Sequence, residues 1–235
     1  MPEPRLELTR IERCLRVVQR DFAKINATLN SRRDTLDDDV VANMLSGYAY
    51  VNSMLEQGHD PFKRGQHGHL LELNTIVLCG HSLDQRRRFH RHTEATEAHF
   101  YETSGGGIRD VAEWYEGHKG DDPWEKASGV YIRVLSEPQL FIEGNHRTGA
   151  LIMSYLLVRS GRPPFVLKID NAKGYFDPST LIRMTCKHTV TAYWRLPRMK
   201  KTFAAFLREH VDKKSLSKCQ VTGGGRRMNG CEGAR

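Results

Sequence analysis

Apolar residues recur at helical spacing through the first part of the chain. From residue 11 to residue 29 they follow one another at intervals of three or four, as Ile11, Leu15, Val18, Phe22, Ile25 and Leu29. Such intervals place side chains on one face of an α-helix, so we expect a first long helix over residues 6 to 30. A coiled coil would show the same spacing over at least three to four heptads. The stretch here is shorter, which favours a helix docked on its own domain.

Helix signals continue along most of the chain. A polar turn, SRRDTLDDD, offers an N-cap before VVANMLSGYAYVNSMLEQG, where Gly58 is a natural stop. HLLELNTIVLCG is short enough to be a buried helix or a strand, and we favour a helix. Further helices are expected in IRDVAEWYEGH, in PWEKASGVYIRVLSE, from His146 to Arg159, and in MKKTFAAFLREHV.

Residues 84 to 104 have a different pattern. The segment DQRRRFHRHTEATEAHFYETS is polar and aromatic, alternates weakly and ends at the triple glycine of residues 105 to 107. Alternation of polar and apolar residues is typical of a half-buried strand. We therefore expect a β-hairpin or an extended flap in this segment.

Composition limits the class of protein. A chain of 235 residues with 39% hydrophobic residues can bury a core. It has no apolar stretch of about 18 residues, and MPEPRLELTRIER lacks the apolar centre of a signal peptide. The five cysteines are far apart and form no CxxC pair, which is typical of reduced thiols. These features predict a soluble, cytoplasmic protein without a membrane segment.

The formal charge of +8 is unevenly distributed. Residues 211 to 235 carry six Lys/Arg and two acidic residues, and have too few apolar residues to pack, so a disordered basic tail is expected. Nucleic-acid binding through this tail or through Arg86 to Arg88 would be generic, because such runs are as easily solvated faces. Nucleic acid is therefore not the favoured partner.

The stretch FIEGNHRTG, residues 141 to 149, gathers polar residues between an expected helix and the start of the next one. Backbone N–H groups at a helix start bind anions, and Gly144 would let a phosphate approach the backbone. Glu143 could hold a magnesium ion that bridges to phosphate oxygens. Arg147 could donate to those oxygens, and Asn145 could either orient the loop or donate to the anion. Each residue alone also fits an ordinary helix start, with an acid, a cap, a turn glycine and a solvated arginine. Together they predict a diphosphate and magnesium site.

The same stretch resembles the Fic/Doc (Fido) family, whose signature reads HPFxEGNGRTxR. The corresponding residues here are QLFIEGNHRTGA, from Gln139 to Ala150, and the match comprises Phe141, Glu143, Gly144, Asn145, Arg147 and Thr148. The resemblance implies a mainly α fold, a Fido-type helical domain with a small β-hairpin flap over a helix–loop–helix active site. It covers residues 67 to 210 in outline. Residues 1 to 66 would then be N-terminal helices packed on or extending the core.

Proteins of this family mostly transfer AMP from ATP to a hydroxyl side chain of a target protein, and some relatives move phosphate or phosphocholine. The resemblance implies that Glu143 is the Mg²⁺ ligand, that Gly144, Asn145 and Arg147 hold the phosphates, and that Phe141 anchors the loop. In the family the flap aligns the target by strand addition, so a protein substrate is expected to dock at residues 84 to 104.

Three positions depart from the family pattern. Gln139 stands where the family has its catalytic histidine, and a glutamine cannot serve as a general base. His146 replaces the second glycine, which adds bulk near the phosphates but also offers a substitute base. Ala150 stands where many members have a second arginine. The expected function is a Fic-like transferase with altered catalysis, which uses His146 or substrate assistance.

Two other functions stay open. One is a Fido pseudoenzyme that senses a nucleotide or docks a partner protein. The other is a metal site built from histidines, for which the candidates are His81, His90, His92, His99, His118 and His188. No pair of these has an HExxH-type spacing, which makes surface histidines the commoner explanation.

Overall fold

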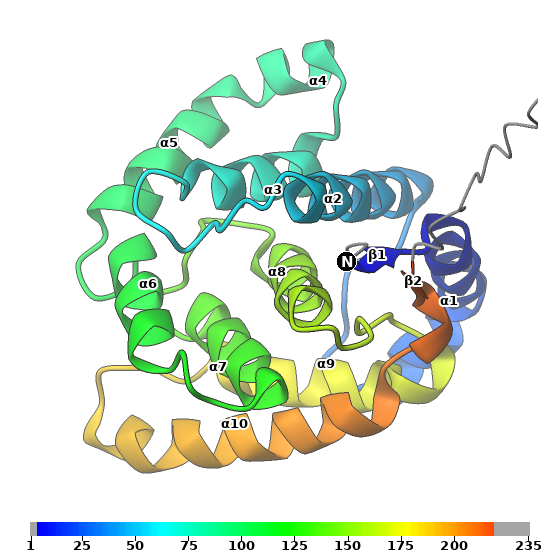
Figure 1. Cartoon of the computed structure of the whole chain (residues 1–235). Coiled ribbons are helices and arrows are strands. Elements are labelled where there is room, and N and C mark those ends of the chain that lie inside the picture. Colours follow the sequence, from blue (N-terminus) through cyan, green and yellow to red (C-terminus); the bar gives the residue numbers. More distant parts are fainter. Residues whose placement is uncertain (1–3, 219–235) are drawn as a thin grey trace, which may run out of the picture.

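The computed structural model describes residues 4–218, and the predicted mainly helical fold is confirmed (Figure 1). Its elements, in chain order, are β1 (Pro4–Leu6), α1 (Leu8–Thr28), α2 (Asp38–Glu56), α3 (Gly68–Cys79), α4 (Leu83–Arg88), α5 (His90–Glu102), α6 (Ile108–Gly117), α7 (Pro123–Leu135), α8 (Asn145–Arg159), α9 (Ile169–Arg183), α10 (Val190–His210), a 3₁₀ turn (Lys213–Ser215) and β2 (Leu216–Lys218).

Helix α8 lies in the middle of the molecule (Figure 1). Its residues from Thr148 to Val158 are all buried, as expected for a helix that is surrounded by other elements. Helices α2, α3 and α7 pack directly against it. The main core cluster runs from Leu6 to Leu207, so the N-terminal helices share one core with the rest. The N-terminus of α8 is thereby held by elements from distant parts of the sequence.

The expected N-terminal helices are present. In α1 the buried residues include Ile11, Leu15 and Val18, and the helix packs on α2 and α9, so it is docked on its own domain rather than forming a separate coiled coil. The polar turn before α2 supplies its cap, because the Asp37 side chain accepts a hydrogen bond from the Val40 amide. Gly58, just beyond α2, has the left-handed φ of +65° typical of a helix stop.

The predicted flap is wrong: residues 84 to 104 form α4 and α5 rather than a hairpin. Ser82 caps α4 by accepting from the Gln85 amide. In α5 only Thr96 and Phe100 are buried, and this spacing of four is helical. The weak alternation in the sequence came from exposed residues, which do not constrain the backbone.

Two helices differ from the sequence pattern near the C-terminus. Helix α9 contains Gly174 and Pro178, which usually weaken helices. A Cβ on Gly174 would lie 2.6 Å from Phe206 Cε2, so the glycine permits close packing against α10. Helix α10 begins at Val190, nine residues before the expected MKKTFAAFLREHV, and it includes Pro197.

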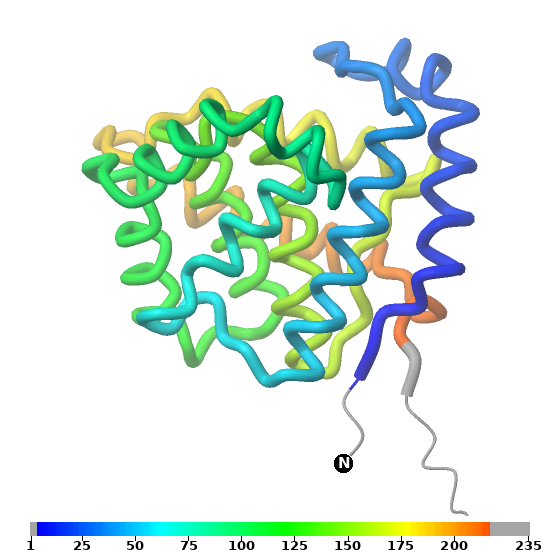
Figure 2. The backbone as a smooth tube through the Cα atoms, turned by 90° about the horizontal axis from the view of Figure 1, so that it is seen from above, coloured from blue at the N-terminus to red at the C-terminus, as the bar shows by residue number. Residues whose placement is uncertain are grey.

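The two ends of the described chain meet. Strands β1 and β2 pair antiparallel, with Pro4 opposite Lys218, and Figure 2 shows them side by side. Asp212 is buried and pairs with Arg10 and Lys168 at 2.7 and 3.2 Å. The predicted tail therefore begins too early, since residues 211 to 218 are part of the folded structure. Its remainder, residues 219 to 235, lies outside the described residues. In the described part, no helix is both long and apolar enough to cross a membrane.

Candidate functional site

Residues 139 to 144 form the loop between α7 and α8, and this motif loop is held from within. Phe141 is buried, and its ring stacks on Phe100 of α5 with centroids 5.6 Å apart. The Asn145 side chain accepts from the Phe141 amide at 2.9 Å and donates to the Phe141 carbonyl at 2.7 Å. Its Nδ2 also donates to Gln139 Oε1 at 3.2 Å. Phe141 therefore anchors the loop. The side-chain amide of Asn145, which could have donated to a phosphate, instead orients the loop through its hydrogen bonds to the Phe141 backbone.

Gly144 makes the turn from the loop into α8. Its φ of +77° lies in the left-handed region, where a side chain would be strained. A Cβ at this position would also lie 2.9 Å from Nδ2 of Asn74. Asn74 uses that nitrogen to donate to the Glu143 carbonyl at 2.9 Å and to Thr148 Oγ1 at 3.0 Å. The turn is therefore fixed both by its glycine and by a side chain from α3.

The first turn of α8 has unpaired backbone donors. Among residues 4–218, no acceptor is found for the amides of Asn145, His146 and Arg147, and the first paired amide is that of Thr148, which donates to the Gly144 carbonyl at 2.9 Å. These donors lie at the positive end of the helix dipole. Arg147 Nη1 donates to the Val77 carbonyl at 3.3 Å, and burial lowers its pKa, although an arginine stays protonated. The helix start can therefore hold an anion.

Glu143 lies at the exposed rim of this helix start. Its side chain is 60% exposed, and its Oε2 is 4.0 Å from His92 Nε2 of α5. His92 Nε2 is buried and has no hydrogen-bond partner among the described residues. The carboxylate is thus free to bind a cation beside the unpaired amides. Within residues 4–218 no three His, Cys, Asp or Glu side chains gather as a metal site, so any such cation would take its other ligands from water or a bound phosphate.

Gln139 is held in place by its own loop. Its side-chain Nε2 donates to the Leu135 carbonyl at 3.1 Å, and its backbone carbonyl oxygen accepts from His99 Nε2 at 2.9 Å. Thr103 Oγ1 lies 3.1 Å from the other ring nitrogen of His99. Helix α5 is thereby joined to the motif loop, but no titratable side chain occupies the position of the family's catalytic histidine.

His146 points into the protein instead of towards Glu143 and Gln139. Arg33 Nη1 donates to its Nε2 at 3.1 Å, and the Tyr131 hydroxyl lies 3.4 Å from its Nδ1. Burial, with the charges of Arg33 and Arg183, lowers the pKa of His146 to about 3. Its basic lone pair is occupied and its basicity is low, so the geometry does not support the predicted role as a substitute base.

We expect this buried, neutral imidazole to make the fold sensitive to acid. An unfolded histidine titrates near pH 6.5, whereas His146 in the fold titrates only near 3. The unfolded state therefore takes up the proton first, and the free energy of unfolding falls as the pH drops from about 6.5 towards 3. In urea titrations between pH 7 and 4, His146→Gln should lose less stability than the unchanged chain. Equal losses in both proteins would contradict this assignment.

Several residues around the site are not apparent from the sequence pattern. Arg33 lies in the connection between α1 and α2, and also donates to the Phe176 carbonyl and to Thr180 Oγ1, at 2.9 and 2.6 Å. For His92 and His99 the sequence offers only a metal site or ordinary surface histidines as explanations. Asn74 had a detectable signal, because it is a lone amide inside the apolar run HLLELNTIVLCG. A buried amide in such a run must find polar partners, here at the motif loop.

No family model matches the sequence. Two curated relatives are each named protein adenylyltransferase fic-1, from Caenorhabditis elegans and Caenorhabditis briggsae. Each is 28% identical over 100 residues, a match that covers 37% of this chain and 19% of the relative. The match thus spans about a fifth of the length of these relatives.

Two solved structures are also similar. A Fic-1 fragment from C. elegans superimposes with a TM-score of 0.48 and 16% identity, over 86% of this chain and 64% of that one. A Fic-domain signalling protein from Bacteroides thetaiotaomicron gives a TM-score of 0.46 and 14% identity, over 86% of this chain and 90% of that one.

The site belongs to the class of helical domains that present a glycine turn and an acid at a helix start. Over those 100 residues the chain is similar to two proteins named for Fic, in agreement with the resemblance of its motif to the Fic/Fido family.

Proposed function

We propose that the protein is a Fic-type transferase that moves a nucleotidyl or phosphoryl group from a magnesium-bound nucleotide to a protein hydroxyl. One observation carries the proposal: the unpaired amides of Asn145, His146 and Arg147 lie beside the exposed carboxylate of Glu143. Amides at a helix start attract phosphate, while a lone carboxylate there would repel it. A cation between the carboxylate and the phosphates removes that conflict. ATP, or another nucleotide or diphosphate donor, has the matching chemistry.

Magnesium suits the groups that are present. It keeps several waters and is usually held by one or two carboxylates together with substrate phosphates. Glu143 supplies one exposed carboxylate, and the guanidinium of Arg147 is near enough for the two charges to influence each other. In this proposal Glu143 holds the ion, which offsets phosphate charge, while Arg147 and the α8 amides hold the phosphate oxygens. Gly144 makes the turn that presents these amides, because its φ of +77° lies in the left-handed region.

The proposed transfer proceeds without a protein base. The target hydroxyl oxygen forms a bond to the α-phosphorus, the bond from that phosphorus to its bridging oxygen breaks, and pyrophosphate leaves. Phosphoryl transfer would use the γ-phosphorus in the same way and release the nucleoside diphosphate. In either case the hydroxyl proton passes to a phosphate oxygen, because Gln139 cannot accept it and His146 faces the core. Loss of a positioned base typically slows such a step about 10²- to 10⁴-fold.

The way in which a target docks must differ from the predicted strand addition. Strand addition needs unpaired N–H and C=O groups in an extended edge. In α5 these groups are used within the helix. A target protein remains part of the proposal, and so does a cytoplasmic location, but a strand at residues 84 to 104 does not.

A second function, a nucleotide-sensing or protein-docking pseudoenzyme, is favoured by one observation. The hydrogen bond from Asn145 to Gln139 ties the residue in the base position to the loop. Such an arrangement stabilises the anion-binding start of α8 without offering any group that could accept a proton.

One experiment separates these functions. The purified chain is incubated with Mg²⁺ and nucleotides labelled at either the α- or the γ-phosphate, and both binding and label transfer to protein are measured. Binding with transfer of the α-label indicates nucleotidyl transfer, and transfer of the γ-label alone indicates phosphoryl transfer. Binding without transfer indicates the pseudoenzyme. Failure of every nucleotide to bind, with and without Mg²⁺, would contradict both functions.

A further inference from the structure

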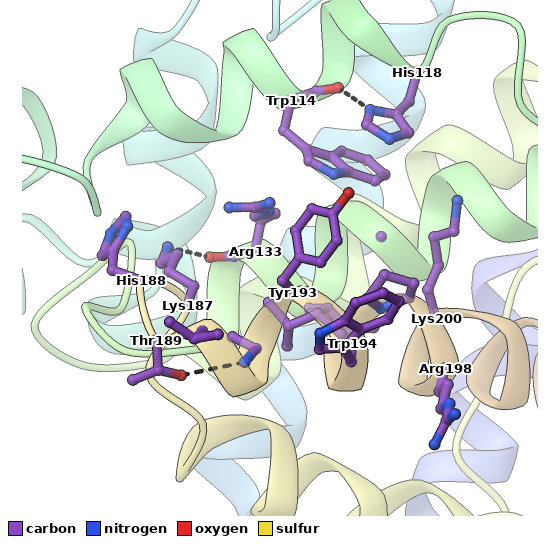
Figure 3. A pocket seen from close by; sticks show the side chains of 16 residues that line it. Trp114, His118, Arg133, Lys187, His188, Thr189, Tyr193, Trp194, Arg198 and Lys200 are labelled. Atoms are coloured by element: carbon purple, nitrogen blue, oxygen red, sulfur yellow. Dashed lines mark hydrogen bonds between the residues drawn. The ribbon is translucent and has the colours of Figure 1, made fainter.

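A groove of about 740 Å³ opens between α6, α7 and the first turns of α10 (Figure 3). We refer to it as the α10 groove. None of the residues named for the nucleotide site lines it. Its walls include Trp114, His118, Arg133, Tyr193, Trp194 and Arg198.

One wall of the α10 groove is rigidly built. The Trp114 indole stacks on His118, with ring centroids 4.0 Å apart and planes inclined by 14°. On its other side the indole lies against α7 at Gly129, where an added Cβ would lie only 1.9 Å from Trp114 Cη2. Glycine inside a helix costs roughly 0.5–1 kcal/mol relative to alanine. Here the glycine lets the Trp114 indole pack directly against α7, and this packing offsets the cost. The aromatic wall is therefore in place before any ligand binds.

The other wall exposes apolar side chains to solvent. Tyr193 is 74% and Trp194 66% exposed, and their rings are perpendicular, with centroids 5.3 Å apart. Of the ten large hydrophobic residues that are exposed within residues 4–218, three line this groove, and they are Val190, Tyr193 and Trp194. A concentration of this kind, as opposed to scattered single residues, marks an interaction site.

The charges around the groove select its ligand. No aspartate or glutamate lines it. Two of its cations, Arg133 and Lys187, pair with Asp110 at 3.3 and 3.2 Å. A third, Lys200, pairs with two carboxylates outside the groove, at 2.8 and 3.2 Å. Within the described part of the chain, Arg198 has no carboxylate at ion-pair distance, so it is the cation that remains for a ligand.

We propose that the α10 groove binds a short linear segment of a partner protein, in which an aromatic or large aliphatic residue lies next to an aspartate or glutamate. The apolar residue would pack on the exposed rings of Tyr193 and Trp194, and the carboxylate would pair with Arg198, whose side chain extends away from Trp114 at the outer edge of the groove (Figure 3). This docking site goes beyond the proposed transfer reaction and does not depend on it.

Two other occupants fit the groove less well. Single-stranded nucleic acid needs a row of uncompensated cations and parallel rings for successive bases. Here three of the four cations are already paired, and Tyr193 and Trp194 are perpendicular. The chain's own residues 219 to 235 include three arginines and one acidic residue, so Arg198 would repel rather than attract them.

The test pans a displayed library of random 12-residue peptides against the full chain, and measures dissociation constants of synthesised peptides by fluorescence anisotropy. The expected sequences carry an acidic residue beside an aromatic or large aliphatic one. Trp194→Ser should weaken their binding about tenfold or more, as for an interface hot spot. Arg198→Glu should have an effect of similar size through charge reversal. Both side chains project from the surface, so thermal unfolding should confirm that the variants remain folded.

Matched controls are available on the same surface. Arg195 is also exposed on α10 but does not line the groove, so Arg195→Glu should change binding less than about threefold, because solvent screens its charge. Leu83→Ser removes a side chain that is 70% exposed on α4, and should have no effect.

The proposal would be overturned if no enriched peptide depended on Trp194, or if the enriched peptides were basic. Competition by a 20-mer of deoxythymidine would indicate a nucleic-acid site instead. A dimer of the unchanged chain in light scattering that Trp194→Ser dissociates would indicate an interface between two copies of the chain.

Discussion

Glu143→Ala is expected to abolish the magnesium-dependent part of nucleotide binding while leaving the fold intact. The side chain is 60% exposed, and within residues 4–218 its ion-pair partner is His92 at 4.0 Å, so its removal deletes no packed core group. Without the carboxylate, the ion would be held by phosphates and water alone, as in free solution. Calorimetric titration of ATP or another nucleotide, with and without Mg²⁺, measures the change directly.

The control for Glu143→Ala is Glu97→Ala, which removes an exposed acid from α5 and should leave binding unchanged. Thermal unfolding of both variants checks that the fold is retained. If Glu143→Ala binds nucleotide with an unchanged dependence on Mg²⁺, the carboxylate is not the metal ligand. The amides at the start of α8 would then have to bind the nucleotide phosphates without a magnesium ion at Glu143.

Gln139→His is expected to raise label transfer by about 10²-fold or more, since it supplies a general base at the position where the family has one. Gln139 already lies in the motif loop and contacts Asn145, which positions a new imidazole beside the phosphate seat. Because His146 faces Arg33 and Tyr131, it should not crowd that seat, and the single substitution should suffice. The measurement is the initial rate of transfer from α-labelled ATP with Mg²⁺.

The matched variant for this prediction is Gln139→Asn, which changes size but adds no titratable group and should not raise the rate. The double variant Gln139→His with His146→Gly restores the family motif, yet it also leaves Nη1 of Arg33 without its acceptor and removes the ring that lies beside Tyr131. We therefore expect it to be less stable than Gln139→His alone in urea unfolding. Unchanged transfer by Gln139→His, with nucleotide still bound, would indicate a different donor or a pseudoenzyme.

Local signals in the sequence predicted much of the fold. The spacing of Ile11, Leu15 and Val18 predicted α1, and the Asp37 cap and Gly58 stop bounded α2. Gly144 was expected to let a phosphate approach the backbone, with an ordinary turn glycine as the alternative, and its φ of +77° fits the turn. These features depend on residues within a few positions of one another, so they can be read without knowing what packs against them.

Long-range packing decided the elements whose local signals were weak or misleading. The polar segment that forms α5 is fixed by Phe100 stacking on Phe141, which lies 41 positions further along the chain. Helix α9 forms in spite of Gly174 and Pro178 because α10 packs against it. Such contacts can outweigh weak intrinsic preferences.

The sequence by itself determined which chemical groups gather at the start of α8, because Glu143, Gly144 and Arg147 are neighbours in the chain. The tertiary structure decided which of them are free to act. Arg33 draws His146 inward, and the loop engages Asn145, while Glu143 and the helix-start amides remain unpaired. The physical reason is that a buried polar group without a partner costs free energy, and partners such as Asn74 and Arg33 come from segments that only folding brings to the loop.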